Sequence, residues 1–144
     1  MSGKFTSLIT TTDPVLRNQS LETACRGLGL HDLLEECREL ETFRLQSQNL
    51  YERVRALFLM YALHRYYLPR HLGSASRGLI PYEGYLHLLQ RRFDEAIESF
   101  LKTLTETGPS DAISSALAAA YYSLGFQTLA EQVRRSVRSA QENQ

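Results

Sequence analysis

Apolar residues recur every three or four positions along most of this chain, and that spacing is the period of an amphipathic α-helix. Between residues 31 and 45 the apolar positions share one side, while charged residues take the other. Residues 50–68 differ, because the middle of this segment, ALFLMYAL, is apolar on nearly every face. A helix that is apolar all round belongs in the interior of a protein. We therefore expect this segment to pack against both the N-terminal helices and the C-terminal half of the chain.

Residues 79–141 show four more helical segments, arranged as two pairs. Pro81 begins the first helix, which ends in a tight turn at the sequence RRF before a second helix starts. The third helix keeps its apolar residues at helical spacing up to Gly125, and a narrower stripe follows. The members of that stripe are Phe126, Ala130, Val133, Val137 and Ala140. This pattern predicts two helical hairpins, the second with its turn at Gly125.

Polar residues and helix breakers divide the rest of the chain. Residues 1–12 are rich in threonine and have no period, so we expect a flexible arm. Asp13 with Pro14, and then Ser20, are start signals for two short helices that open an N-terminal helical region, residues 13–68. The sequence RHLGSASRG at residues 70–78 is small, polar and flanked by glycine, which favours a mobile loop.

The chain of 144 residues is long enough for one domain with a core that needs no metal or disulfide. No alternating run of strand length occurs in the sequence. The predicted fold class is therefore all-α: a single helical domain over residues 1–144, a bundle of about seven helices with two stacked hairpins in its C-terminal half. The final residues QENQ contain no helix stop signal, which suggests the N-terminal part of a longer protein.

Residues 77–140 repeat one hairpin at an offset of 34 positions. The first helix of the second unit contains LAAAY at residues 117–121, and the second helix of the first unit contains AIESF at residues 96–100. This period and these residues resemble the tetratricopeptide repeat, a helical hairpin of 34 residues. The TPR-like resemblance implies stacked hairpins that bind a protein or peptide. It also implies close helix crossings at the small residues Ala96, Ala118 and Ala130.

In the repeat family, the ligand groove is lined by the first helix of each hairpin. The 34-residue register then selects Tyr82, Tyr85, Leu88, Leu89, Ser115, Ala119, Tyr122 and Ser123. None of these residues is charged, so the groove suits an apolar helix or an extended segment that is anchored by aromatic contacts. The alternative is that the chain's own helix at residues 50–68 fills the groove, which would explain why that helix is apolar on all sides.

The last predicted helix also has a local positive face. Arg134, Arg135 and Arg138 project from the side opposite its apolar stripe and could hold a phosphate or an acidic peptide. Exposed arginines near a helix C-terminus also complement the helix dipole, so an ordinary surface role is the alternative. Across the whole chain, 16 basic and 16 acidic residues cancel. Together with the lack of a nucleic-acid motif, this balance makes nucleic acid an unexpected partner.

The sequence contains no set of residues typical of an active site. The four histidines are spread along the chain without metal-ligand spacing, and neither a P-loop nor a GxSxG motif occurs. We therefore expect no enzymatic activity, no metal and no cofactor. Cys25 and Cys37 occupy helical apolar positions, so we interpret them as buried free thiols, with a disulfide as the alternative. Free thiols indicate a reducing compartment.

No secretory signal and no apolar run of membrane-spanning length is present, so we expect a cytoplasmic protein without a membrane segment. The leading hypothesis for function is a protein–protein interaction or assembly module built of TPR-like hairpins. Its open faces would be covered by a protein or peptide partner, by a second copy in a homo-oligomer, or by a downstream domain of the same protein. The alternative hypothesis is a non-catalytic accessory or regulatory domain of a larger enzyme.

Overall fold

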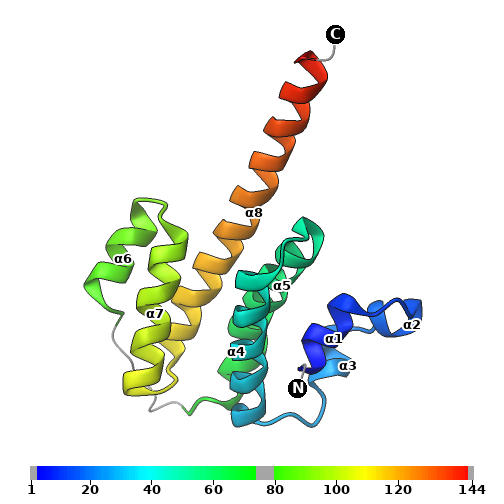
Figure 1. Ribbon diagram of the computed structural model, residues 1–144. Coiled ribbons are helices and arrows are strands. Elements are labelled where there is room, and N and C mark those ends of the chain that lie inside the picture. The colour runs from blue at the N-terminus through cyan, green and yellow to red at the C-terminus, as the bar shows by residue number, and fades with distance from the viewer. Residues whose placement is uncertain (1–2, 74–79, 143–144) are drawn as a thin grey trace.

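A computed structural model describes residues 3–73 and 80–142 of the chain (Figure 1). These residues form eight α-helices and no strand, which confirms the predicted all-α class. The α-helices are α1 (Lys4–Thr10), α2 (Pro14–Arg17), α3 (Leu21–Cys25), α4 (Leu30–Gln46), α5 (Leu50–Ala62), α6 (Tyr82–Leu89), α7 (Phe93–Thr107) and α8 (Asp111–Glu142). A π-helical turn, η1 (Leu63–Tyr67), and a 3-10 turn, η2 (Leu68–His71), continue α5.

The core lies where α5 and the first half of α8 pack against each other. Helix α5 also packs on α4 and α1, and α8 also packs on α7, while α6 packs on α7 at the outer edge. Leu57, Met60 and Leu63 from the α5 side and Leu117 and Tyr121 from α8 are buried there. The prediction that residues 50–68 form a central helix is confirmed, because this segment contacts both halves of the chain.

The predicted arm at residues 1–12 is wrong over most of its length, because residues 4–10 form helix α1. Phe5, Leu8 and Ile9 on this helix are buried. The carboxylate of Glu36 on α4 accepts hydrogen bonds from the backbone N–H groups of Lys4 and Phe5, at 3.1 and 3.2 Å. These amides have no partner within α1, so Glu36 stabilises its first turn. Residues 1 and 2 lie outside the described residues.

The two helix starts predicted at Asp13 and Ser20 are confirmed by capping hydrogen bonds, and a cap of the same kind at Asn49 begins α5. The side chains of Asp13, Ser20 and Asn49 accept hydrogen bonds from the backbone N–H groups of Val15, Thr23 and Glu52 respectively, at 3.0 to 3.1 Å.

The loop predicted for residues 70–78 lies partly in a described element and partly outside the described residues. Arg70 and His71 belong to η2, whereas residues 74–79 lie outside the described residues.

Helix α8 is continuous, so the turn predicted at Gly125 and the second hairpin do not form. Gly125 packs against the ring of Phe58 on α5: a Cβ atom at position 125 would lie 2.8 Å from the Phe58 Cζ atom. The glycine therefore permits a close approach between α5 and α8 rather than a chain reversal. The first predicted hairpin is present as α6 and α7, where Gly84 lies against Phe100 in the same way.

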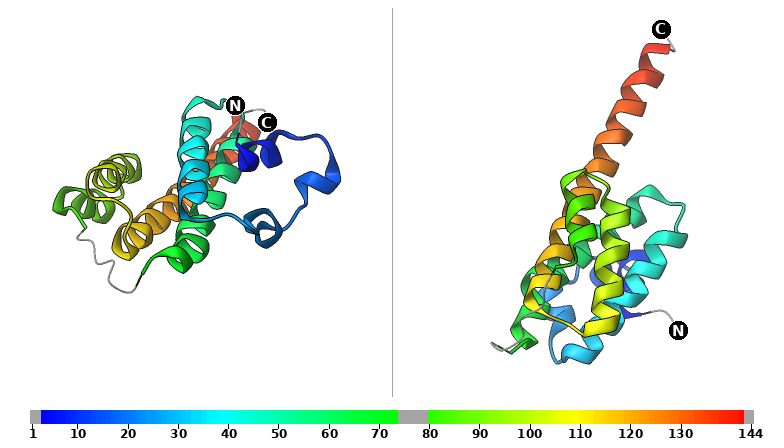
Figure 2. Two further views of the ribbon diagram at one scale, coloured as in Figure 1. Left: turned by 90° about the horizontal axis from the view of Figure 1, so that it is seen from below. Right: turned by 90° about the vertical axis from the view of Figure 1, so that its left-hand side faces the viewer.

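The C-terminal half of α8 extends away from the other helices (Figures 1 and 2). Every residue from 129 to 141 is exposed. Ala96 and Ala118 are buried, but Ala130 lies on this extension, so its predicted place at a helix crossing is wrong. Among the helices that the structure describes, none has the length and apolar character needed to cross a membrane.

Candidate functional site

One side of α8 is exposed from its first turns to the end of the extension. We call this surface the α8 face, and its members are Ser115, Ala119, Tyr122, Phe126, Leu129, Val133 and Val137. They are spaced by three and four residues, so they share one side of the helix. Over the extension the large members are well exposed, Val133 at 61% and Val137 at 52%. From Ser115 to Val137 the face is about 33 Å long, at 1.5 Å per residue.

The middle of the α8 face is built from packed aromatic rings. The ring centroid of Tyr122 lies 4.8 Å from that of Tyr61 and 4.8 Å from that of Phe126. Phe126 also meets Phe58 edge to face at 5.5 Å. These contacts hold the two exposed rings of α8 against α5 and fix their orientation. Toward the N-terminal end of α8, a shallow hollow of about 430 Å³ adjoins these rings. Its lining residues are Tyr61, Arg65, Ser115, Ala118, Ala119 and Tyr122.

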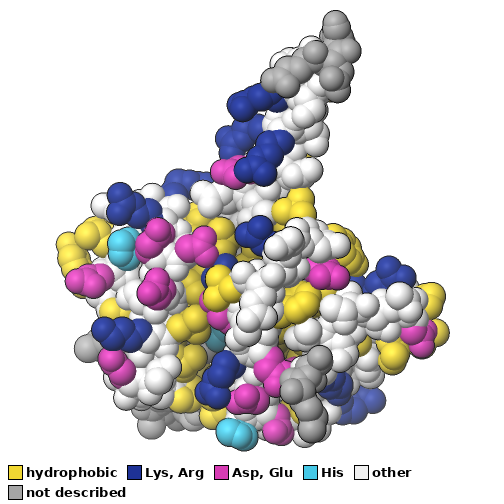
Figure 3. Space-filling model, in the orientation of Figure 1, with side chains coloured by type: hydrophobic (Ala, Val, Ile, Leu, Met, Phe, Trp, Pro, Cys, Tyr) yellow, Lys and Arg dark blue, Asp and Glu magenta, His cyan; other side chains and the backbone are white. Residues whose placement is uncertain are grey.

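Basic side chains border the α8 face. Arg134, Arg135 and Arg138 are all exposed, and dark blue side chains gather along the extension in Figure 3. With 3.6 residues per turn, only Arg134 lies on a flank of the face, about 90° from its centre, which corrects the expectation that all three arginines lie opposite the apolar stripe. Arg138 lies farther round the same side of the helix, and Arg135 points directly away from the face. Arg135 is 4.0 Å from Glu131. Among the described side chains, Arg134 and Arg138 have no acidic partner, and like charges at this i,i+4 spacing repel.

The predicted groove residues do not lie in one groove. Tyr82, Tyr85 and Leu89 are exposed on α6, which packs against α7 at the far edge of the molecule. Ser115 and Tyr122 lie on α8, in the α8 face. The alternative, that the helix at residues 50–68 fills the groove, holds only in part and only at Tyr122. One edge of the Tyr122 ring packs on Tyr61 of α5, but the side chain is still 43% exposed.

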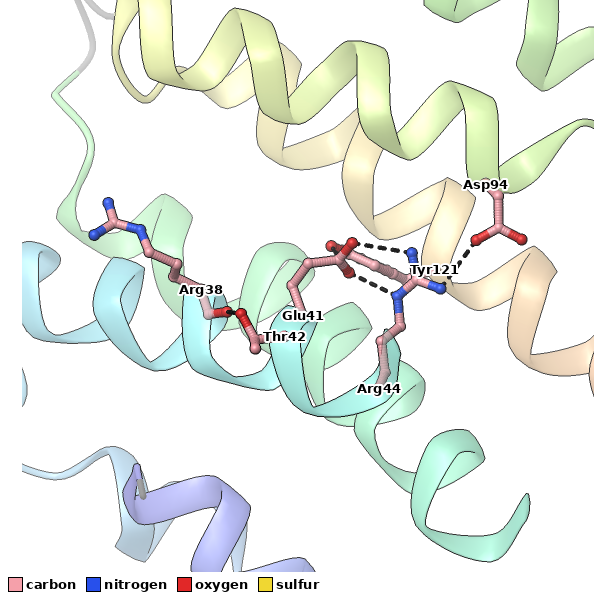
Figure 4. A network of polar contacts seen from close by, with 6 residues as sticks. All are labelled: Arg38, Glu41, Thr42, Arg44, Asp94 and Tyr121. Atoms are coloured by element: carbon pink, nitrogen blue, oxygen red, sulfur yellow. Dashed lines mark hydrogen bonds and ion pairs between the residues drawn. The ribbon is translucent and has the colours of Figure 1, made fainter. Parts of the chain in front are cut away.

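A buried polar network, which the sequence did not reveal, joins α4 to α7 and α8 (Figure 4). The Arg44 guanidinium donates to Glu41 through Nε at 2.6 Å and Nη2 at 3.0 Å, and to Asp94 through Nη1 at 3.0 Å. The Tyr121 hydroxyl donates to the same Glu41 carboxylate at 3.0 Å. Burial on its own would lower the pKa of Arg44, but the bonds to Glu41 and Asp94 raise it above its usual value. Arg44 therefore stays charged and holds these helices together.

Both cysteines are free and buried, as predicted. Burial, with a smaller contribution from the charge of Glu22, raises the pKa of Cys25 to about 11. Burial raises the pKa of Cys37 as well. Neither thiol is therefore activated as a nucleophile at neutral pH. Within the described part of the chain, no group of three His, Cys, Asp or Glu residues is close enough to hold a metal ion.

No protein-family model, no curated protein and no solved structure significantly matches this chain. The resemblance to the tetratricopeptide repeat therefore stays a prediction from the residues that suggested it.

Proposed function

We propose that this chain is a protein-interaction module that binds an amphipathic helix of a partner protein along the α8 face. The observation that carries the proposal is the extension of α8, where Leu129, Val133 and Val137 are exposed on one side of a helix that no other described element covers. A row of this kind, with anchors three and four residues apart, is what a helix needs in order to pack against another helix.

Two physical arguments favour an occupant for this face. A single-helix extension of this length is marginal in water, because most helical stability in proteins comes from packing of an apolar side. A contiguous apolar surface bordered by polar residues is also the usual mark of an interaction site. Packing a second helix along the α8 face would therefore stabilise the extension and cover its valines in one step.

The charges on the flank indicate which helix fits. Arg134 borders the face, Arg138 lies farther round the same side one turn later, and Arg65 lines the hollow at the other end of the face. An acidic flank on the partner would pair with these guanidinium groups and relieve the repulsion between Arg134 and Arg138. A second copy of this chain would bring the same arginines instead of carboxylates. We therefore assign the face to a different helix with an apolar stripe and acidic flanks, carried by another protein or by a further domain.

Two synthetic helical peptides test the proposal, both with leucines at heptad spacing but one flanked by glutamate and the other by lysine. The glutamate peptide should bind the chain about tenfold more tightly in fluorescence anisotropy, because opposite charges meet across the flank. Changing Val133 and Val137 together to Gln should abolish binding. The matched control changes Glu131 and Ser139 to Gln, because both are exposed on the far side of the same helix, and it should keep binding.

Charge reversal makes the test specific. Replacing Arg134 and Arg138 by Glu should transfer the preference to the lysine peptide. Equal binding of the two peptides, or binding that survives the double valine change, would contradict the proposal. Sedimentation is the second arm: a parent chain that self-associates, and becomes monomeric when Val133 and Val137 are changed, would show that a second copy is the occupant.

A further inference from the structure

A cleft separate from the α8 face lies where α4, η1, α7 and the middle of α8 meet. Its volume is about 340 Å³, at the lower end of the range for small-molecule sites. The walls are mainly apolar, with a few polar side chains at defined places. The lining residues are Leu34, Cys37, Arg38, Glu41, Thr42, His64, Leu101, Leu104, Thr105, Pro109 and Tyr121. Hydrophobic side chains are visible along the seam between α7 and α4 in Figure 3.

His64 is the unusual member of this lining. It is only 1% exposed, and neither ring nitrogen has a hydrogen-bond partner among the described residues. The ring stacks on Tyr121, with centroids 5.8 Å apart and planes at 25°. A buried polar group without a partner costs about 1 to 3 kcal/mol, so a ligand group that hydrogen-bonds to His64 would be stabilised there. The residue also lies in the π-helical turn η1, and such turns are frequent at functional sites.

The electrostatics of the cleft exclude a charged ligand group at His64. Burial lowers the pKa of His64 to about 4, so the imidazole is neutral near pH 7, with one N–H donor and one bare nitrogen acceptor. The nearby Glu41 carboxylate already accepts from Arg44 and Tyr121, and it would repel an anion. At the rim, Arg38 is paired with Glu35 at 2.9 Å. The cleft therefore offers neutral hydrogen bonding and apolar contact.

We propose that this cleft binds a neutral small molecule with an apolar body and a carboxamide or hydroxyl head, and that the head hydrogen-bonds to His64. Both head groups can donate and accept, so either one suits an unpartnered imidazole nitrogen of His64, whichever tautomer the ring adopts. The apolar body packs between Leu34 of α4 and Leu101 and Leu104 of α7. This inference is independent of the proposed partner helix.

Benzamide is the probe, with toluene as the analogue that lacks the head and benzoate as the charged one. NMR of ¹⁵N,¹³C-histidine-labelled protein follows the ring nitrogens and the Hε1–Cε1 pair of His64. Benzamide should shift these signals saturably, and benzoate should bind about tenfold more weakly, because its carboxylate would lose water beside Glu41 while Arg38 at the rim is already paired with Glu35. The His64→Phe variant should lose about tenfold in benzamide affinity and change little for toluene, since one hydrogen bond is removed.

The parent protein alone keeps the proposal falsifiable if His64→Phe does not fold. Benzamide must then change the ¹⁵N shifts of the His64 ring, and toluene must not, because only a hydrogen bond perturbs those nitrogens strongly. Unchanged ¹⁵N shifts up to the solubility of benzamide would overturn the assignment, as would equal losses of benzamide and toluene in His64→Phe. Changing Val133 and Val137 to Gln should leave benzamide binding intact, which separates this test from that of the α8 face.

Discussion

Removing the Arg44 side-chain charge is the sharpest test of what holds α4 to the C-terminal helices. Arg44→Met keeps most of the volume and helix propensity of the side chain but deletes three hydrogen bonds to Glu41 and Asp94. The Glu41 carboxylate would keep one donor, the hydroxyl of Tyr121. Because Glu41 is only 14% exposed, the charge that is left would be poorly solvated.

The expected loss of stability follows from that burial. Breaking a buried ion pair by removing one partner typically costs about 3 to 5 kcal/mol, and partial exposure of Glu41 places this case near 3 kcal/mol. Asp94 is 61% exposed, so Asp94→Asn should cost less than about 1 kcal/mol. Replacing Glu41 and Arg44 together by Met should restore most of the loss, because no unpaired charge remains, although the Tyr121 hydroxyl then lacks its acceptor.

Urea denaturation followed by circular dichroism measures these free energies of unfolding. The matched control is Arg38→Met on the same helix, since Arg38 pairs with Glu35 on the exposed side, and it should change stability by no more than about 0.5 kcal/mol. The reasoning is refuted if Arg44→Met behaves like Arg38→Met. It is equally refuted if the double variant is no more stable than Arg44→Met, because the cost would then come from lost packing rather than from an unpaired carboxylate.

Three further predictions concern single sites. His64 has a pKa of about 4 in the folded chain against 6.5 unfolded, so its contribution to stability is complete above pH 6.5 and falls by about 3 kcal/mol as the pH drops to 4. Urea titrations across that range should show this slope in the parent and not in His64→Phe. Gly125→Ala should fail to gain the roughly 1 kcal/mol that alanine brings to a helix interior, unless Phe58 is also changed to Leu. Thermal denaturation of the single and double variants checks it. Tyr82→Ala and Tyr85→Ala should each cost no more than about 0.5 kcal/mol in urea, because both rings are exposed, and a larger loss would place them in a packed interface.

The helices that could be predicted are those whose signals are local. Asp13, Ser20 and Asn49 each accept an amide two or three residues ahead, and such caps are legible in the sequence. Helix α1 was not predicted because its apolar stripe spans only two turns. Its first backbone amides are satisfied by Glu36, about thirty positions away. A partner at that distance leaves no local trace.

The sequence indicates part of the buried network, namely Arg44 and its neighbour Glu41. Arg44 continues the buried series Leu33, Cys37 and Leu40 at spacings of four, three and four, so an arginine stands where an apolar residue is expected. A charge at such a position needs a buried partner, and Glu41, three residues earlier, is a natural one. Asp94 and Tyr121 could not have been named, because only the packing of α7 and α8 brings them to α4.

Helix α8 explains why the second hairpin was predicted wrongly and why its residues still matter. The apolar series before Gly125 ends at Leu124 and the next one begins at Phe126, and two residues turn a helix by about 200°. A turn in the chain would bring both apolar series to the core, and this is the turn that the sequence predicts at Gly125. The helix is continuous instead: its first half is buried on one side, and its second half exposes apolar residues on the opposite side. That opposite side already contains Ser115 and Tyr122, so two of the residues selected by the hairpin register share one surface with the stripe of the extension. The apolar series changes sides near Gly125, where α8 stops packing in the core and begins to expose its apolar residues.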